Sequence, residues 1–417
     1  MQYSYNFWTI LVGLIFSTPV FGQATADTLS LTGTMADTVV ANNYSKEAFT
    51  CFKRKEWDKA LGLLDIAGTI FLSTTGAESA GYGVVLHRKG LIYRNINQLD
   101  SAIRYYEMAI SVRSKALNFY HEDVANSYNN AGNAYRAKGD ADMSLDRHKK
   151  ALEIRQHLYG ENNADVAASY YSIALAYFDK SDYEKSLESH RKALTIRLVL
   201  QDAVDLANSY NDIGITLSEM GQFEGAVDNL RKALVFRIES YGSDSPEVAS
   251  VYNNIGGISC YAGDYQTGLS AFQHALETRI KLLGNNSPKV AETYENIGLA
   301  LAKIGRYREA LINYLKSKAI IVNNLGPDDP KVAKIDEFIA GVYMRFDEHQ
   351  KSIEYHFDAL RIYAKSMGEN NLKVAGVYNN LGVSYAALGD YIKSEAYHLK
   401  DLEITRLLLG ENHLDVS

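Results

Sequence analysis

The side chains able to do metal or acid–base chemistry are spread along the whole 417-residue chain. His148, His190, His356 and His398 occupy one position of a repeating pattern, so we predict that they are packing residues. His349 lies two turns before His356, but two ligands do not make a metal site. The sequence holds no His-Glu-x-x-His, Cys-x-x-Cys or phosphate-binding Gly-rich motif, and no outstanding carboxylate pair. We therefore predict no catalytic site, metal or cofactor.

Composition excludes several classes of protein. The net charge is only −7, and acidic and basic residues alternate, so we expect no nucleic-acid partner. The two cysteines, Cys51 and Cys260, cannot supply a disulfide framework. Cys51 falls on a core position and is expected to be a small buried hydrophobe. A chain of 417 residues is too long for one compact core, so several domains or a repeat array are expected.

The N-terminus has the pattern of a secretory signal. Phe7–Phe16 is a ten-residue apolar run, too short to span a bilayer but long enough for a signal-peptide core. Val20 and Gly22 stand three residues and one residue before a cleavage point at Gln23. Met1–Asn6 departs from the pattern because it contains no Lys or Arg.

We predict that residues 1–22 are a cleaved signal peptide. Residues 23–36 are rich in Ala, Thr, Asp, Ser and Gly, and we predict a flexible spacer there. The mature chain is then exported and has no stable membrane insertion.

A repeat of 42 residues dominates the rest of the chain. A segment typified by residues 123–132 recurs along the chain, and one of the steps is 40 residues long. In one repeat Asp336 replaces the tyrosine of this segment. The recurring tyrosines are Tyr128, Tyr170, Tyr210, Tyr252, Tyr294 and Tyr378. Half a period later a small residue recurs, and this position changes to aspartate at Asp401. These small residues are Ala67, Ala109, Ala151, Ala193, Ala233, Ala275, Ser317 and Ala359.

Both halves of each repeat are predicted to be helices, because apolar residues recur at three- and four-residue spacing. Ser245, Ser287 and Asp329 each precede a proline, which predicts a capped helix start with proline in the first turn. Glycines follow the second helices, where we expect a left-handed αL residue. These are Gly160, Gly242, Gly284, Gly326, Gly368 and Gly410. Other glycines mark the turn inside each hairpin, namely Gly139, Gly221, Gly263, Gly305 and Gly389.

At this point the chain resembles the tetratricopeptide repeat family. One repeat matches the family pattern of aromatic and small residues with Tyr128, Ala131, Gly132, Tyr135, Ser144, His148 and Ala151. The usual repeat has about 34 residues, and this longer form is similar to the variety in kinesin light chains and many bacterial repeat proteins. The resemblance covers residues 37–412 as nine tandem hairpins. It implies an all-α solenoid, a right-handed superhelix of stacked antiparallel hairpins with a concave groove.

Small residues are expected where helices of such a solenoid approach closely. Enlarging them would overpack the contact, at roughly 1–3 kcal/mol. In the first helices these residues are Gly132, Gly214, Gly256, Gly298 and Gly382.

Asparagines recur at the positions of the first helices that the resemblance places in the groove. Asparagine is a poor helix residue, so its recurrence needs a reason. One interpretation is inheritance of the repeat with hydrogen bonding between adjacent helices. The other is a row of amides that grips the backbone of an extended peptide. The candidate peptide-binding residues are Asn126, Asn129, Asn130, Asn133, Asn208, Asn211, Asn253, Asn254, Asn296, Asn379 and Asn380.

These features favour a non-enzymatic protein-interaction scaffold that binds an extended peptide or a partner protein. We expect a bacterial chain that is exported, periplasmic or extracellular, because of the predicted signal peptide. The alternative is the N-terminal sensor or interaction module of a longer signalling protein. Such proteins continue into a caspase-like peptidase or a histidine kinase, as the resemblance implies.

The C-terminal hairpin is expected to lack a cap. Residues 413–417 match the start of a tenth repeat, since Val416 lies 42 residues after Val374. The final second helix would then leave apolar side chains uncovered, and such a surface marks an interface or a missing domain. We therefore expect truncation or end-to-end self-association. The side chains concerned are Leu402, Ile404, Leu407, Leu408 and Leu409.

Overall fold

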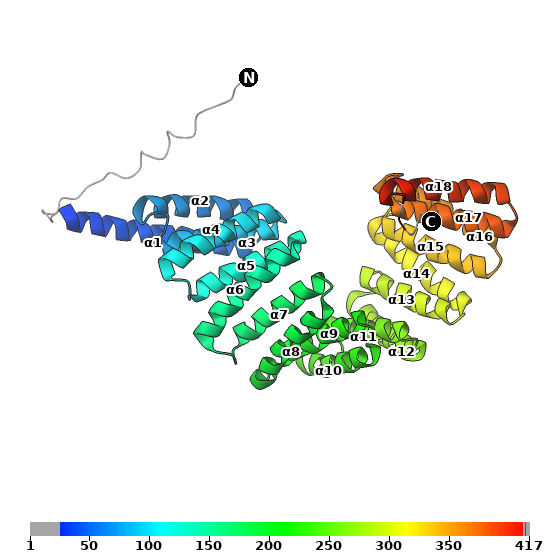
Figure 1. Cartoon of the computed structure of the whole chain (residues 1–417), viewed down its shortest axis with the longest axis horizontal. Helices are drawn as coiled ribbons and strands as arrows, with labels where there is room; N and C mark the ends of the chain where they lie inside the picture. Colours follow the sequence, from blue (N-terminus) through cyan, green and yellow to red (C-terminus); the bar gives the residue numbers. More distant parts are fainter. Residues whose placement is uncertain (1–25, 412, 414–417) are drawn as a thin grey trace, which may run out of the picture. The chain divides into compact units, whose positions relative to one another are not determined.

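The computed structural model of the chain describes residues 26–411 and His413. These residues form eighteen α-helices and no strand, and consecutive helices pair as hairpins, so the predicted all-α solenoid class is confirmed (Figure 1). We call the first helix of each hairpin (odd numbers) the A helix and the second (even numbers) the B helix. The predicted signal peptide, residues 1–22, and residues 414–417 of the predicted tenth repeat lie outside the described residues.

The chain divides into two compact units, residues 1–158 and residues 159–417. The first unit holds three hairpins, made of α1 (Ala26–Lys53), α2 (Trp57–Thr74), α3 (Ala80–Asn95), α4 (Leu99–Leu117), α5 (Glu122–Lys138) and α6 (Ala141–Tyr159). The second unit holds six hairpins, made of α7 (Ala164–Asp179), α8 (Tyr183–Leu200), α9 (Ala203–Glu219), α10 (Phe223–Tyr241), α11 (Pro246–Tyr261), α12 (Tyr265–Leu283), α13 (Pro288–Lys303), α14 (Tyr307–Leu325), α15 (Pro330–Arg345), α16 (His349–Met367), α17 (Leu372–Leu388) and α18 (Tyr391–Leu409).

The first helix differs from the prediction at its start. We predicted a flexible spacer over residues 23–36, but α1 already begins at Ala26. The segment 26–36 contains Ala, Leu and Met, which favour helix, and no proline to stop it. Helix can therefore extend backwards from the first hairpin.

The predicted helix starts are confirmed by their capping hydrogen bonds. The Ser245 hydroxyl accepts from the backbone N–H of Val248 at 3.2 Å, and the Asp329 carboxylate accepts from that of Lys331 at 2.9 Å. Ser287 caps α13 in the same way, and a proline follows each of the three caps. Each cap satisfies a helix N–H that has no partner within its own helix.

The glycines after the B helices have the positive φ that we predicted, but their ψ differs from that of an αL residue. Gly242 has φ 78° and ψ 164°, so it is not the αL residue that we predicted. Its positive φ still favours glycine, and its large ψ ends the helical turn. Inside the hairpins, Gly139 is αL, with φ 87° and ψ 8°.

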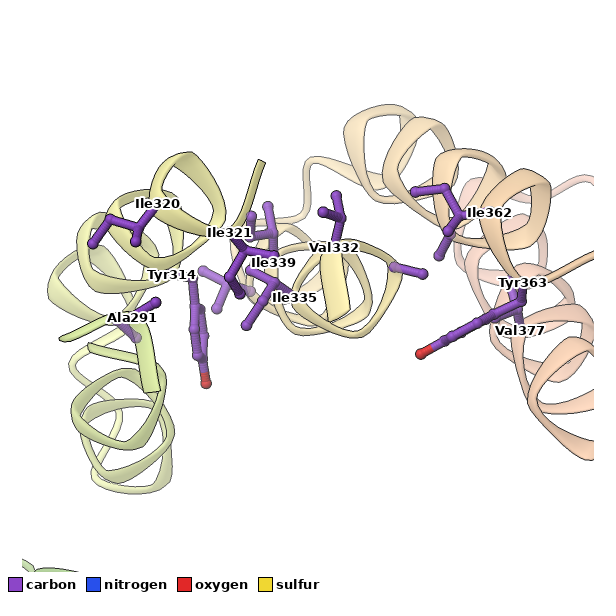
Figure 2. Close-up of a cluster of buried hydrophobic side chains, with 14 of the residues drawn as sticks. Ala291, Tyr314, Ile320, Ile321, Val332, Ile335, Ile339, Ile362, Tyr363 and Val377 are labelled. Carbon is purple, nitrogen blue, oxygen red and sulfur yellow. The ribbon is translucent and has the colours of Figure 1, made fainter. Parts of the chain in front are cut away.

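The core is built where small residues on A helices receive bulky side chains from B helices. A Cβ at Gly298 would lie 2.5 Å from the ring of Tyr314, and one at Gly256 would lie 2.5 Å from Phe272. Figure 2 shows Tyr314 packed beside Ile321 of the same helix and Ile335 of α15. The prediction that these glycines permit close approach is confirmed. The group that approaches is a B-helix ring in most repeats, and at Gly214 it is the Leu230 side chain and the Ala226 carbonyl.

The histidines belong to the same packing series. His148 packs on Gly132, and His398 packs on Gly382. A Cβ added at these glycines would lie 2.7 Å and 2.6 Å from the respective imidazole rings. His148, His190 and His356 are buried, and Cys51 is buried as well. Their prediction as packing residues is confirmed.

One of the side chains predicted to be uncovered in the last hairpin is buried. Leu407 and Leu408 are exposed, by 65% and 44%, but Ile404 is buried and belongs to the core of the second unit. The prediction for Ile404 was wrong because this residue lies on the face of α18 that packs inwards. End-to-end association stays a prediction.

Candidate functional site

The predicted asparagines fall on one face of the A helices, which we call the A-helix face. We number positions from the repeat tyrosine. The A-helix face contains position −2 and positions +1, +2, +5, +8 and +9, which share one side of a helix. The structure links neighbouring A helices across this face. The residue one after the tyrosine position bonds to the residue two after it in the next repeat.

In the second unit this link is made mainly by amides. Asn254 Nδ2 donates to Asn211 Oδ1 at 3.2 Å, and Asn296 Nδ2 donates to Asn253 Oδ1 at 3.1 Å. Asn380 Nδ2 lies 3.5 Å from Glu337 Oε2. We call this row of inter-repeat hydrogen bonds the amide ladder.

Other residue types make the same link elsewhere. The Tyr171 hydroxyl donates to Asp212 at 2.6 Å. In the first unit, Arg88 donates to the Ser45 hydroxyl at 2.6 Å, and Asn130 bonds to the His87 ring at 3.3 Å. The amide ladder is therefore one version of a general junction between hairpins.

Two predicted asparagines meet arginines of the B helices instead. Asn126 Oδ1 accepts from Arg155 at 3.0 Å, and Asn208 Oδ1 accepts from Arg237 at 2.6 Å. Among the described residues, Asn133 and Asn379 have no side-chain hydrogen bond, and Asn129 Oδ1 is buried without a partner. The predicted set is thus brought onto one face within each unit, but its members have different partners.

Buried arginines are the main feature that the sequence interpretation missed. Arg279 is 4% exposed and donates to the Lys289 carbonyl at 3.0 Å and to the Thr293 hydroxyl at 2.7 Å. Arg113 bonds to Ser127, and Arg197 bonds to Ser209, both at 2.8 Å. Each ties a B helix to the next A helix.

The sequence did carry a signal for this link. Arginine recurs at the repeat spacing, and a Ser or Thr follows it by twelve or fourteen residues in every case except Arg237, which Val251 follows. Where the arginine is replaced by Ile321, the partner is replaced by Ile335. Polar and apolar versions of one contact therefore both occur along the chain.

The irregular Asp336 is buried and ion-paired. Its Oδ1 accepts from Lys318 Nζ at 2.6 Å, while Oδ2 has no partner among the described residues. Burial raises the pKa of Asp336 to about 6, and the ammonium of Lys318 opposes that rise. A carboxylate in the tyrosine position is thus accommodated by a lysine at a position that is leucine in neighbouring repeats, Leu276 and Leu360.

The histidines do not form a metal site. Among the described residues, no group of three or more His, Cys, Asp or Glu side chains could hold a metal ion. Burial lowers the pKa of His148, His190 and His356 to about 4 in each case. These rings are neutral packing groups at neutral pH.

We expect the free energy of unfolding to fall as the pH drops from 6.5 towards 4. In this window the unfolded chain binds protons on these histidines and the folded chain does not, so each contributes a slope of up to about 1.4 kcal/mol per pH unit. Above pH 6.5 their full contribution is present. Urea unfolding at several pH values measures the slope.

A variant with phenylalanine at two of these positions is the control for that experiment. Phe272 already occupies the equivalent position of another repeat, so His148→Phe with His190→Phe preserves the packing. The variant should be less sensitive to pH between 6.5 and 4. An unchanged slope would show that other groups with a lowered pKa, such as His87, set the acid sensitivity. Asp336 acts in the opposite direction, because its raised pKa lets the folded chain bind a proton before the unfolded chain does.

Comparisons with known proteins agree with this arrangement. The tetratricopeptide repeat model matches residues 123–199, 165–239, 247–321 and 331–400, and a second model of the same description matches residues 84–115. The chain belongs to the tetratricopeptide repeat family. Together these matches cover more than half of the chain, so the predicted family is confirmed. No curated protein matches significantly.

Solved structures show the same fold at low sequence identity. The apo form of RapI has a TM-score of 0.61 and 16% identity, with 88% of this chain and 98% of that chain covered. The apo form of the quorum sensor NprR from B. thuringiensis has a TM-score of 0.58 and 18% identity, with 86% and 99% covered.

A signal-transduction ATPase with numerous domains from Pyrococcus horikoshii, with a tetratricopeptide repeat sensor, has a TM-score of 0.58 and 14% identity. It is matched over 84% of this chain and 53% of that one. These structures support the fold alone. Within residues 26–411, no helix has both the length and the apolar character needed to cross a bilayer.

Proposed function

We propose that this tetratricopeptide repeat protein is a non-enzymatic scaffold whose A-helix face binds an extended polypeptide. The observation that carries the proposal is the amide ladder. Asn254 and Asn296 each donate one N–H to the neighbouring helix. A side-chain amide has two N–H donors and an acceptor oxygen, so further hydrogen-bonding capacity remains. Both side chains are only half-buried, so this spare capacity faces outwards.

An extended peptide fits such a surface for a physical reason. Its backbone presents one N–H and one C=O for each residue, and these groups need partners when they leave water. A row of amides fixed by neighbouring helices supplies both donors and acceptors without first losing side-chain freedom. The structural role of the ladder and the binding role are therefore compatible.

Replacing Asn253 and Asn254 by alanine should weaken peptide binding roughly tenfold or more, because each amide contributes about 1 kcal/mol. A suitable ligand is selected first from a random peptide library displayed on phage. Its dissociation constant is then measured for both proteins by fluorescence anisotropy, together with their melting temperatures.

The matched control replaces two asparagines of the B helices. Asn229 and Asn313 each donate to a carbonyl of their own helix, at 2.8 Å, and lie off the A-helix face. Asn229→Ala with Asn313→Ala should leave the affinity unchanged. If the A-helix double variant melts early yet binds the selected peptide normally, the ladder is purely structural and the binding proposal fails.

A second candidate function is supported by the Pyrococcus horikoshii structure, whose description includes a tetratricopeptide repeat sensor. We propose as the alternative that the chain is the sensor or interaction module of a longer signalling protein. Sequencing the gene beyond Ser417 separates the two functions. An effector domain in the same reading frame would favour the sensor module, and a stop codon would favour the scaffold.

We also propose that the protein is exported. The support is the apolar run Phe7–Phe16, followed by Val20 and Gly22. Mass spectrometry of the protein from its own cells should find a mature N-terminus at Gln23. A mature form that still begins at Met1 would contradict export by this route.

A further inference from the structure

The A helices of the first unit differ in charge from those of the second. The segments 42–53, 84–95 and 126–137 each run from two residues before the tyrosine position to nine after it. Their only carboxylate is Glu47, which lies off the A-helix face and 3.9 Å from Lys59 of α2. The cations on the A-helix face of this unit are Lys46, Lys53, Arg88, Arg94 and Arg136.

The second unit has the opposite balance in its equivalent segments. Its cations are Lys303, Lys334 and Arg345, and Lys334 pairs with Glu295 at 2.6 Å. The carboxylates of these segments outnumber the cations and are Asp179, Asp212, Glu219, Glu292, Glu295, Asp336 and Glu337. The excess of positive charge on the A-helix face is therefore specific to the first unit and is not a general feature of these repeats.

Two cations of the first unit lie over one aromatic side chain. Phe49 stacks on Phe52 with ring centroids 5.7 Å apart. Lys53 Nζ lies 4.9 Å and Arg88 Cζ lies 5.3 Å from the centre of the Phe49 ring. Leu91 of α3 packs closely at the same place, and both phenylalanines are only half-buried, so part of each ring is exposed. An apolar contact and positive charge are thus offered at the same place.

Four of the five cations on this face form no ion pair among the described residues, namely Lys46, Lys53, Arg88 and Arg94. The pKa of the neighbouring His87 falls to about 3, mainly through burial and further through Arg113, Arg88 and Arg94. The positive potential on this face is therefore available to a ligand.

We propose that the A-helix face of the first unit binds an acidic, extended peptide segment of a partner protein. Its carboxylates would lie opposite Lys46, Lys53 and Arg88, with an apolar side chain against Phe49. Asn129, Asn130 and Asn133 on the adjacent α5 would meet its backbone. Peptide is favoured over nucleic acid because amides line the face and the net charge of the chain is −7. This inference rests on the proposed function.

The test uses the full chain and three fluorescein-labelled twelve-residue peptides of one design, with Glu, Gln or Lys at four alternating positions. We expect the Glu peptide to bind at least about tenfold more tightly than the Lys peptide in 50 mM NaCl, and its affinity to fall as salt is added. Lys46→Glu with Lys53→Glu should weaken the Glu peptide by about tenfold or more. Both lysines are exposed, so folding should be preserved, and circular dichroism checks it.

The control moves the same charge off the face. Arg54, in the turn after α1, and Arg104, on α4, are both exposed, and Arg54→Glu with Arg104→Glu should leave the affinity within about twofold. Equal weakening by both double variants would mean that only net charge matters and would overturn the proposal. Tighter binding of a single-stranded oligonucleotide, lost in Lys46→Glu with Lys53→Glu, would overturn it in favour of nucleic acid.

The failures of the two proposals are distinguishable. If library-selected peptides bind through the amide ladder but the Glu and Lys peptides bind alike, the charge preference is wrong and the scaffold function stands. If neither selected peptides nor the Glu peptide binds, the scaffold function itself is wrong.

Discussion

Replacing Gly256 by alanine is expected to destabilise the second unit by about 1–3 kcal/mol. The added Cβ would lie 2.5 Å from the Phe272 ring, a distance that a real side chain does not tolerate. The ring is 2% exposed and packed on all sides, so α11 and α12 must separate to relieve the clash. The gain of up to about 1 kcal/mol in helix propensity offsets only part of this cost.

The adjacent Gly257 provides the matched control. Within 4 Å of a Cβ built there the structure places no atom outside the backbone of its own helix, and the residue lies in the middle of α11. Gly257→Ala should therefore stabilise the protein, by up to about 1 kcal/mol. Urea unfolding of both variants, with hydrogen exchange of α11 and α12, measures the difference. If both substitutions change stability in the same direction, the packing description of α11 is wrong.

Replacing Arg279 and Thr293 together is expected to cost less than the sum of the two single replacements. Arg279→Ile removes the donors to Thr293 and to the Lys289 carbonyl, and should cost about 2–4 kcal/mol. Thr293→Ile leaves the buried guanidinium short of an acceptor, and should cost about 1–3 kcal/mol. The double variant copies Ile321 and Ile335, which belong to one core cluster (Figure 2).

The double-mutant cycle should therefore show a coupling of about 1–3 kcal/mol. Unfolding of a repeat array need not be two-state, so the free energies are best compared by hydrogen exchange of α12 and α13. Lys281→Ala serves as a control, because Lys281 is an exposed residue on the same helix as Arg279. Strictly additive single effects would show that Arg279 and Thr293 do not act as one contact.

Much of the fold was predictable because each structural feature of the hairpin recurs in several repeats. Ser245 and Asp329 show the same cap, and Gly256 and Gly298 show the same close approach, so one misread position does not mislead. The start of α1 at Ala26 lacks this redundancy and was predicted wrongly. The burial of Ile404 was also predicted wrongly, although isoleucine recurs at its repeat position and is buried there, at Ile154, Ile196, Ile320 and Ile362.

The candidate site was predicted as a set of positions but not as a set of contacts. Asparagines such as Asn211 and Asn254 lie on the expected face of the A helices. Their pairing depends on how one hairpin stacks on the next, which no pattern within a single helix reveals. The offset of 43 residues between these partners, one more than the repeat step, was the available sequence signal. It becomes meaningful only when the stacking is known.

The central claim is that partners bind on the A-helix face, and site-specific photo-crosslinking tests it most directly. A photoreactive amino acid is placed at Ser250 or Lys303 on the A-helix face, or at Val235 or Ile312 on the B helices, all of which are exposed. The account predicts that a library-selected peptide crosslinks from Ser250 and Lys303 and not from Val235 or Ile312. Crosslinking mainly from Val235 and Ile312 would contradict it.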